Sequence, residues 1–535
     1  MNLAARSRRR GLGLLLAGAL ATTACGSTVQ SSGGPVAGGG AVSAGGGAAV
    51  GDGLGGPALP GAPGSADSAT GPIGAVGAGS AGAAGGSALT GSGSGATDFG
   101  STSGSAGAAP GAPGAAGSGA GPTSGGFVNG PGVTDTTIAL GITICTDCDS
   151  INASFGAGGG DDEVDVRDYY KAAFDEISSR GGVLGRKLVP VYYEYSASRT
   201  YDEIEQGACE YFTKDHKVAV IFLRGELSYE CAKKAGIVVV GFGDAGPVFD
   251  RYPNLFDPTG TRLERLGAAT VKGMVQMAWQ KPEPKWPTGK IGLITWEDNG
   301  YKYAIEKGWL PALKASGLKA EDVKYVAVPQ GVKAAGDASA AVSSAVLSFR
   351  DQGIDHVFIA DGPAGIFSGG GLTLLFLNNA KSQRYYPRYG FNSNNAPGNS
   401  IFPADQQSGM LAIDNFDGNR VNDEGIALNP QRERCYAIMK KRGLPAEDEQ
   451  SSGGAARVAC YYAGFTEAVF SRATAGTTLP SVLAAADSLG TSYRAPSSFG
   501  NRLERGRHDG ATFFRNERYD DACSCMKYTS KPYEP

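Results

Sequence analysis

Histidine is scarce in this sequence, whose 535 residues include only His216, His356 and His508. These three lie too far apart along the chain to form a local metal-binding motif. A Gly-x-Ser-x-Gly turn, which presents a nucleophilic serine in many hydrolases, is also missing after residue 130. The sequence therefore predicts a protein that is not an enzyme and that needs neither a metal ion nor another cofactor.

Long apolar runs and clustered positive charge are missing as well. No apolar stretch reaches the length of about 18 residues that a membrane-spanning helix needs. Residues 131–535 carry 44 Lys and Arg against 49 Asp and Glu. Nucleic-acid binding depends on clustered basic side chains that neutralise phosphates, so nucleic acid is not an expected partner.

Residues 31–130 lack the composition of a folded domain. Gly, Ala, Ser and Pro fill 80 of these 100 positions, and 35 of them are Gly. Such a segment cannot bury enough apolar surface to offset the entropy lost on ordering. We therefore expect residues 26–130 to be a disordered tether and residues 131–535 to form two or three domains.

The N-terminal residues predict an export signal. A basic segment, Arg6–Arg10, precedes the apolar run Gly11–Ala21 and then small residues that end at Cys25. This order resembles a bacterial lipoprotein signal, which implies that residues 1–25 are a signal peptide and that a lipid on Cys25 anchors the protein outside the cell membrane. The alternative is that Cys25 belongs to a signal that is cleaved elsewhere. Ser7-Arg8-Arg9 also resembles a twin-arginine signal, so the export route stays open.

The remaining cysteines predict disulfides. They are Cys145, Cys148, Cys209, Cys231, Cys435, Cys460, Cys523 and Cys525. An even number in an exported protein indicates four bonds, for which 105 pairings are possible. Adjacent spacing suggests Cys145–Cys148, Cys209–Cys231, Cys435–Cys460 and Cys523–Cys525. As an alternative, Cys145-Thr-Asp-Cys148 is spaced like a redox motif, and with Cys523 and Cys525 it could bind zinc.

Strands and helices alternate along the rest of the chain. Strands are predicted over residues 137–144, 187–195, 218–223, 237–242, 290–296, 323–328, 355–360 and 510–515. Helices are predicted over residues 165–178, 201–212, 228–235, 262–279, 301–316, 337–350, 370–380, 431–442 and 455–473. This order predicts an α/β protein with two doubly wound parallel sheets, whose ligand lies at the carboxyl ends of the strands.

Three segments carry a resemblance to a known family. Gly132-Val-Thr-Asp-Thr-Thr-Ile, Ser179-Arg-Gly-Gly-Val-Leu-Gly-Arg-Lys-Leu and Asn299-Gly-Tyr301 resemble type I periplasmic binding proteins, specifically the substrate-binding subunits of branched-chain amino-acid ABC transporters. The resemblance implies two lobes that are joined by three crossovers and close over a small solute. It also implies a Cys209–Cys231 bond.

The lobe boundaries follow from the same reading. Lobe 1 would hold residues 131–255 plus about 413–500, and lobe 2 would hold residues 256–412 plus about 501–535. We expect the hinge near Asn254–Thr259 and in two later crossovers.

The candidate ligand-binding residues follow the predicted strands. They are Arg224, Glu226, Asp244 and Ala245 in the first lobe and Tyr301, Asp361, Ser393 and Asn394 in the second. Helix N-termini in these loops offer N–H groups to a ligand. Arg224 could bind a carboxylate, whereas Glu226 and Asp244 favour a cation or a hydroxylated ligand.

Each candidate also has a purely structural interpretation. Arg224 and Glu226 would then pair with each other or with the hinge, and Tyr301 would pack on its own lobe. Asp361 precedes Gly-Pro and could cap the next turn. The polar run 392–395, which contains Ser393 and Asn394, could be a solvated loop.

These observations predict a monomeric solute-binding lipoprotein. It would capture a small polar solute, such as an amino acid or a related molecule, and deliver it to an ABC permease. One alternative is a ligand-sensing receptor of a signalling system with the same fold. A second alternative is a cell-surface thiol oxidoreductase.

Overall fold

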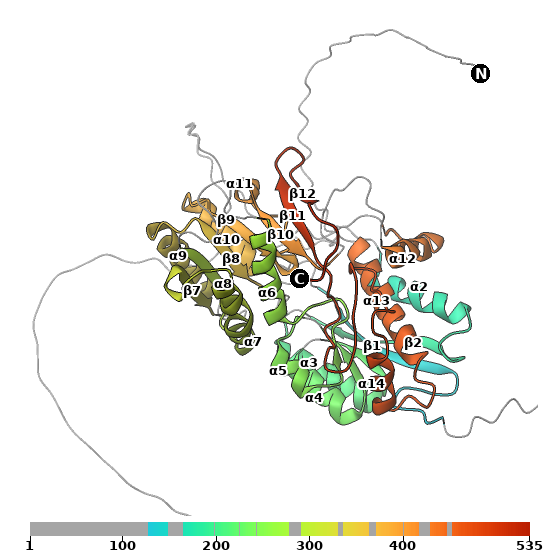
Figure 1. Cartoon of the computed structure of the whole chain (residues 1–535). Coiled ribbons are helices and arrows are strands. Elements are labelled where there is room, and N and C mark those ends of the chain that lie inside the picture. Colours follow the sequence, from blue (N-terminus) through green and yellow to red (C-terminus); the bar gives the residue numbers. More distant parts are fainter. Residues whose placement is uncertain are drawn as a thin grey trace, which may run out of the picture. The chain divides into compact units, whose positions relative to one another are not determined.

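The computed structural model describes residues 127–147, 164–196, 198–223, 225–241, 243–277, 290–329, 335–362, 371–399, 401–416, 429–446 and 452–535. All of them belong to one compact unit, Gly114–Pro535 (Figure 1). The predicted lipidation site Cys25, residues 26–126 of the predicted tether, Cys148 and Arg224 lie outside the described residues. The last residues of that predicted tether, 127–130, are described, and the Val128 carbonyl accepts from the Thr477 amide at 2.8 Å.

The first sheet has five parallel strands in the order β2-β1-β3-β4-β5. They are β1 Thr137–Cys145, β2 Lys187–Tyr195, β3 Val220–Phe222, β4 Val238–Val240 and β5 Leu255–Phe256. The central strands β3 and β4 are buried throughout, as in a parallel sheet covered by helices on both faces. The predicted parallel α/β arrangement is confirmed here.

Helices cover both faces of this sheet. One face packs on α2 Val166–Ser179, α12 Pro430–Lys441, α13 Ser452–Phe470 and α14 Leu479–Asp487. The other face packs on α3 Tyr201–Glu210, the π-helical turn Tyr211–Asp215, α4 Glu226–Ala235 and α5 Gly246–Arg251. We call this sheet and its helices the first lobe.

The second sheet has seven strands in the order β12-β11-β10-β9-β8-β6-β7. They are β6 Ile291–Trp296, β7 Val323–Val328, β8 His356–Ala360, β9 Arg388–Asn392, β10 Leu411–Asp414, β11 Arg515–Asp520 and β12 Cys525–Tyr528. Strands β6 to β10 are parallel, whereas β11 and β12 are antiparallel additions.

The predicted strand at residues 510–515 is wrong in position. The chain there forms isolated bridges, Asp257 with Asp509 and Asn501 with Ala511, before β11 begins at Arg515. The apolar residues that suggested a strand are buried at this crossover instead, because Ala511 and Phe514 are 1% and 2% exposed.

Helices also lie on both faces of the second sheet. They are α6 Leu263–Gln276, α7 Asn299–Ala304, the π-helical turn Ile305–Trp309, α8 Leu310–Ala315, the 3-10 turn Ala320–Asp322, α9 Ala335–Asp351, α10 Gly371–Ser382, the 3-10 turn Ser393–Asn395 and α11 Ala404–Gln407. Helices α9 and α10 share one apolar cluster with the sheet, and α6 and α8 share another. We call this sheet and its helices the second lobe. No helix in the described part of the chain has the length and apolarity that crossing a bilayer requires.

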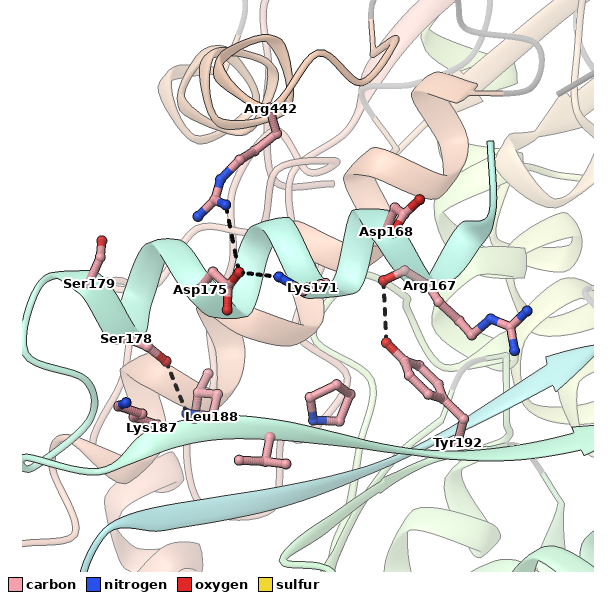
Figure 2. A pocket seen from close by; sticks show the side chains of 12 residues that line it. Arg167, Asp168, Lys171, Asp175, Ser178, Ser179, Lys187, Leu188, Tyr192 and Arg442 are labelled. Carbon is pink, nitrogen blue, oxygen red and sulfur yellow. Dashed lines mark hydrogen bonds and ion pairs between the residues drawn. The ribbon is translucent and has the colours of Figure 1, made fainter. Parts of the chain in front are cut away.

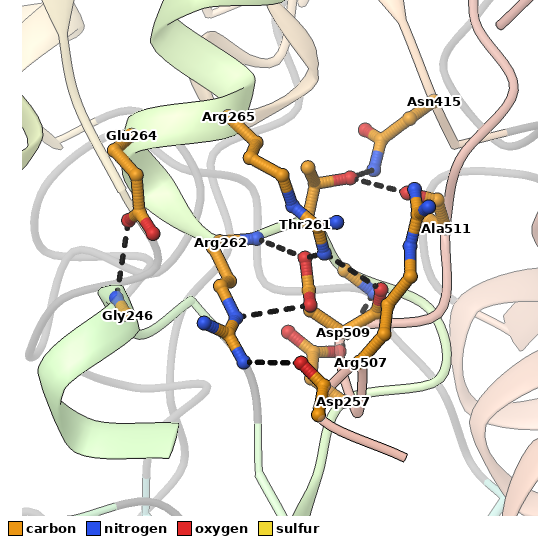
Figure 3. A network of polar contacts seen from close by, with 12 residues as sticks. Gly246, Asp257, Thr261, Arg262, Glu264, Arg265, Asn415, Arg507, Asp509 and Ala511 are labelled. Carbon is orange, nitrogen blue, oxygen red and sulfur yellow. Dashed lines mark hydrogen bonds and ion pairs between the residues drawn. The ribbon is translucent and has the colours of Figure 1, made fainter. Parts of the chain in front are cut away.

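Two of the connections between the lobes lie side by side (Figure 3). The Asp257 amide donates to the His508 carbonyl at 2.8 Å, and the Gly510 amide donates to the Asp257 carbonyl at 2.8 Å. Asp509, which is fully buried, accepts from the backbone amide of Arg262 at 2.9 Å and from its guanidinium at 3.1 Å, and it also pairs with Arg265. This charged cluster fixes the start of α6 against the later crossover.

Within the described residues the structure shows both partners of three disulfides, and Cys145 is disulfide-bonded as well. Cys209 joins Cys231, Cys435 joins Cys460 and Cys523 joins Cys525, with Cα–Cα distances of 6.0, 5.8 and 5.2 Å. The first pair links α3 to α4, the second links α12 to α13, and the third lies in the turn between β11 and β12.

Candidate functional site

The carboxyl ends of the strands bring loops from the two lobes into contact. Ala245, which follows β4 of the first lobe, is buried in the same apolar cluster as Trp296 and Tyr301 of the second lobe. A Cβ atom placed on Gly300 would lie 3.8 Å from the Cβ atom of Ala245. The structure therefore brings together Ala245 and Tyr301, two of the predicted site residues.

Asp244 is held by groups from three elements. Its carboxylate accepts a hydrogen bond from the Tyr229 hydroxyl of α4 at 2.7 Å. Its backbone carbonyl accepts from the Leu263 amide at the start of α6, at 3.1 Å. The preceding Gly243, at φ 77°, donates its amide to Asp257 at 2.9 Å. These bonds fix a half-buried carboxylate beside the contact between the lobes.

Carboxylates of the protein itself occupy the helix N-termini of this region. Glu205 accepts from the Ser228 amide of α4 at 3.2 Å, and Glu264 accepts from the Gly246 amide of α5 at 3.1 Å. Asp298 caps α7, where it accepts from the Gly300 amide at 2.7 Å. These caps take up N–H groups that the sequence analysis expected to be open to a ligand.

Glu226 points toward α5. Its carboxylate pairs with Arg251 at 2.7 Å and accepts from the Tyr252 hydroxyl at 3.3 Å. Burial and the nearby Glu226 charge raise the pKa of Tyr252, and its hydrogen bond with Arg251 partly opposes the shift. The described partners of Glu226 therefore lie in α5 and directly after it, whereas Arg224, its other expected partner, lies outside the described residues.

Tyr301 is buried at the start of α7, where its side chain is 3% exposed. Its hydroxyl lies against the turn that follows β8, because a Cβ atom on Gly362 would come within 2.1 Å of that oxygen. Gly362 thus leaves the space that the phenol occupies. Tyr301 packs on its own lobe and lies beside Ala245 of the other.

Asp361 is buried and accepts four hydrogen bonds. The donors are the Trp296 indole at 3.0 Å and, at 2.9 Å each, the Gly362 amide, the Thr373 amide and the Thr373 hydroxyl. Desolvation raises the pKa of this carboxyl, and the four donors partly oppose the shift. This geometry favours the capping role, in which Asp361 ties β8 to the start of α10.

The polar run after β9 is tied into the site. The Asn394 side chain donates to the Asp361 carbonyl at 3.3 Å, and its backbone amide donates to Asn392 at 3.0 Å. The Ser393 hydroxyl is bonded to Asn415 after β10. Ser393 and Asn394 are only half-buried. They therefore lie in an ordered polar loop, with partial exposure that suits contact with a solute.

A surface hollow of about 650 Å³ lies elsewhere, between α2 and the edge strand β2 (Figure 2). Three of its charged side chains pair with one another, since Asp175 contacts Lys171 at 2.8 Å and Arg442 at 3.7 Å. Pro190 has no backbone N–H group, and the Leu188 amide is bonded to a serine hydroxyl at 3.3 Å, so this strand edge offers few groups to another strand. None of the predicted site residues that the structure describes lines this hollow.

Two sequence comparisons found no match for this chain. No model of a known protein family matches it. No curated protein matches it either.

Solved structures do resemble the chain. A fatty acid ABC transporter substrate-binding protein from Thermomonospora curvata is 14% identical, with a TM-score of 0.54 over 76% of this chain and 95% of its own. An ABC transporter solute-binding protein from Rhodopseudomonas palustris HaA2, in complex with p-hydroxybenzoic acid, is 14% identical, with a TM-score of 0.52 over 74% and 97%. An ABC transporter substrate-binding protein from Desulfitobacterium hafniense, in complex with Leu, is 15% identical, with a TM-score of 0.50 over 73% and 99%.

The match covers nearly all of each of these structures and most of the part of this chain beyond the Gly-rich segment. It agrees with two doubly wound sheets whose strand ends meet. The chain therefore has the fold of the type I periplasmic binding proteins.

Proposed function

We propose that this chain is an extracytoplasmic solute-binding lipoprotein, which captures a small polar solute between its two lobes and delivers it to an ABC permease. One observation carries the proposal: polar loops at the strand ends of two parallel sheets meet around Ala245 and Tyr301. Ligands of open α/β sheets bind at such strand ends. The three similar structures described above are substrate- or solute-binding proteins of ABC transporters.

The proposed site has a polar half in each lobe. Asp244 and Ala245, with Arg224, would contact the solute from the first lobe. Tyr301, Ser393 and Asn394 would contact it from the second. We assign Asp361 to positioning, because its carboxylate is buried and accepts four hydrogen bonds. We assign Glu226 to positioning as well, because its carboxylate pairs with Arg251 of α5.

The proposed location, outside the cell and anchored to its membrane, rests on the N-terminal sequence. Cleavage before Cys25 and lipidation of this residue would anchor the protein, and the Gly-rich segment would hold it away from the membrane. A Gly-rich coil of 100 residues has a root-mean-square span of about 50–60 Å. Metabolic labelling with a radioactive fatty acid tests the anchor, because the label should appear on the wild-type chain and be lost in Cys25→Ser.

A thermal-stability screen tests the solute-binding function. The purified chain is heated with members of a library of amino acids, aromatic acids, fatty acids, sugars and polyamines. A solute present at 100 times its Kd stabilises the folded state by about 2.7 kcal/mol, so its addition should raise the Tm. Calorimetry then gives the Kd of each hit.

A matched pair of variants locates the site. Tyr301→Ala should weaken binding of the solute found in the screen at least tenfold. Tyr325→Ala removes an exposed tyrosine from β7 and should leave the Kd unchanged. If no solute in the library raises the Tm, or if both variants bind like the wild type, the proposed function or the proposed site is wrong.

A further inference from the structure

The turn between β11 and β12 carries the most accessible of the three cysteine pairs that the structure describes. Cys523 is exposed and Cys525 is half-buried. In contrast, Cys435 and Cys460 are 1% and 9% exposed and lie in the core of the first lobe. A disulfide that solvent reaches is open to attack by external thiols, whereas a buried one is protected.

The hairpin does not depend on this disulfide for its shape. Antiparallel pairing already aligns β11 with β12, and Asp520 is the partner of Cys525 in the ladder. The Lys527 ammonium also pairs with the Asp520 carboxylate at 2.5 Å. The cysteines are separated only by Ser524, a residue other than glycine at φ 52°. A left-handed conformation of this kind is energetically unfavourable for such a residue. The conformation of Ser524 in the closed turn therefore disfavours the disulfide-bonded state.

The turn lies beside the amino ends of the parallel strands of the second sheet. The proposed solute site lies at the carboxyl ends of these strands. Strand β11 runs antiparallel to β10, so its end at Asp520 is near the beginning of β10. The Tyr519 amide donates to the Met410 carbonyl at 3.0 Å, and the Ser408 hydroxyl donates to Asp521 at 3.1 Å. The solute loops follow the other ends of β8, β9 and β10. Figure 1 shows this hairpin at the margin of the sheet.

We infer that Cys523–Cys525 is a site of reversible thiol–disulfide exchange with an external thiol. The thiolate of the partner attacks the Sγ atom of Cys523, which is the more exposed of the two cysteines, and the Cys523–Cys525 bond breaks. A mixed disulfide forms on Cys523, and the bonding electron pair leaves on the Sγ atom of Cys525, which takes a proton from water. If the partner is a dithiol, its second thiolate then attacks the mixed disulfide, so that the partner is oxidised and both cysteines are reduced, with two electrons and two protons transferred.

The charge around the turn selects among thiols. Asp520 and Asp521 precede Cys523 by three and two residues, and Lys527 pairs with the first of these carboxylates. The second carboxylate accepts a hydrogen bond from the neutral Ser408 hydroxyl. The approach of an anionic thiol is disfavoured beside this charge, and the approach of a cationic thiol is favoured.

Graded reduction of the native full chain tests the inference. The oxidised protein is equilibrated with mixtures of reduced and oxidised dithiothreitol, quenched with acid, alkylated and mapped by mass spectrometry. Cys523 and Cys525 should become alkylated at a lower ratio of reduced to oxidised reagent than the other cysteines. We expect this ratio to be at least tenfold lower than the ratio needed to reduce Cys209, Cys231, Cys435 and Cys460. The inference is overturned if the turn cysteines are reduced together with the others or after them.

The rate at which the Cys523–Cys525 bond is reduced shows whether its partner is a small thiol or a dithiol protein. Cysteamine, which is cationic, should react at least threefold faster than the anionic mercaptoethanesulfonate, and Asp521→Asn should reduce this ratio. Glu321→Gln is the control, because it removes an exposed acid beside β7, at the opposite edge of the same sheet. A thioredoxin-type dithiol protein that reduces the turn faster than equimolar dithiothreitol would identify a protein partner, and a slower rate would identify small thiols. An unchanged ratio in Asp521→Asn would contradict the electrostatic argument.

Discussion

Asp361 is the residue at which the sequence allowed two roles and the contacts favour one. Four donors surround its carboxylate and leave no place for a side-chain amide group. Asp361→Asn would replace one oxygen with an N–H donor that faces other donors, so we expect the free energy of unfolding to fall by about 1–3 kcal/mol. Urea denaturation measures this change. Asp351→Asn, at an exposed position that ends α9, should change stability by less than about 0.5 kcal/mol.

His508 makes stability depend on pH. Burial lowers the pKa of this side chain below 6.5, although hydrogen bonds to Asp487 at 3.0 Å and to the Leu255 carbonyl at 3.2 Å oppose the shift. The unfolded chain therefore binds the proton at a higher pH than the folded chain. The contribution of His508 to stability is complete above about pH 6.5 and is lost as the pH falls toward its pKa in the folded state.

His508→Gln should remove this dependence. Urea denaturation at about pH 5 and pH 7.5 should show a smaller difference in the free energy of unfolding for the variant than for the wild type. His216→Gln changes an exposed histidine and serves as the control. An equal pH dependence in the wild type and in His508→Gln would assign the titration to other groups.

The capped helix N-termini show which hydrogen bonds can be predicted from adjacent residues and which cannot. Asp298 caps α7 from the adjacent position, so its role is readable from the order Asp-Asn-Gly-Tyr. Glu205 and Glu264 reach their amides from 23 and 18 positions away along the chain. Their roles depend on packing that brings two elements together, which no local pattern contains.

At the scale of elements, long elements with clear periodicity were predictable and short ones were not. Strands β2 and β7 have the predicted bounds, and β1 and α2 differ by one residue. The two-residue strand β5 and the four-residue strands β10 and β12 carry too few residues for a pattern. Their pairing depends on neighbouring strands that lie far away in sequence, and so does the antiparallel edge of the second sheet.

The cysteine pairs should differ in what they contribute to stability. A bond between Cys209 and Cys231 would close a loop with a sequence separation of 22 residues, for which the chain-entropy relation gives about 3 kcal/mol. The Cys523–Cys525 loop, with a separation of 2, would contribute at most about 1.5 kcal/mol, because the left-handed conformation of Ser524 opposes the bond. Replacing both cysteines of a pair with Ala, followed by urea denaturation, should show this order. Equal losses would contradict the loop-length argument.

For the whole molecule, the charged crossover cluster sets how firmly the lobes are joined. Asp509 is buried between Arg262 and Arg265. Asp509→Asn would leave two guanidinium groups without this carboxylate, so we expect a loss of about 3–5 kcal/mol in the free energy of unfolding. The exposed pair of Lys319 and Glu321 provides the control, because Glu321→Gln should change stability by less than about 1 kcal/mol. A small loss in Asp509→Asn would mean that the cluster is not what holds this junction.

The contact between Ala245 and α7 allows closure of the whole molecule to be tested. A Cβ atom on Gly300 would already touch Ala245, so the indole in Gly300→Trp should act as a wedge between the lobes. Closure on a solute requires the lobes to approach each other. The few segments that join the lobes would serve as the hinges of this motion. The variant should therefore bind the solute at least tenfold more weakly and should lose the decrease in radius of gyration that X-ray scattering is expected to show when the wild type is saturated. Lys302→Trp places the same side chain at an exposed position of the same helix and should behave like the wild type. Normal binding and normal compaction in Gly300→Trp would mean that the solute does not draw these two loops together.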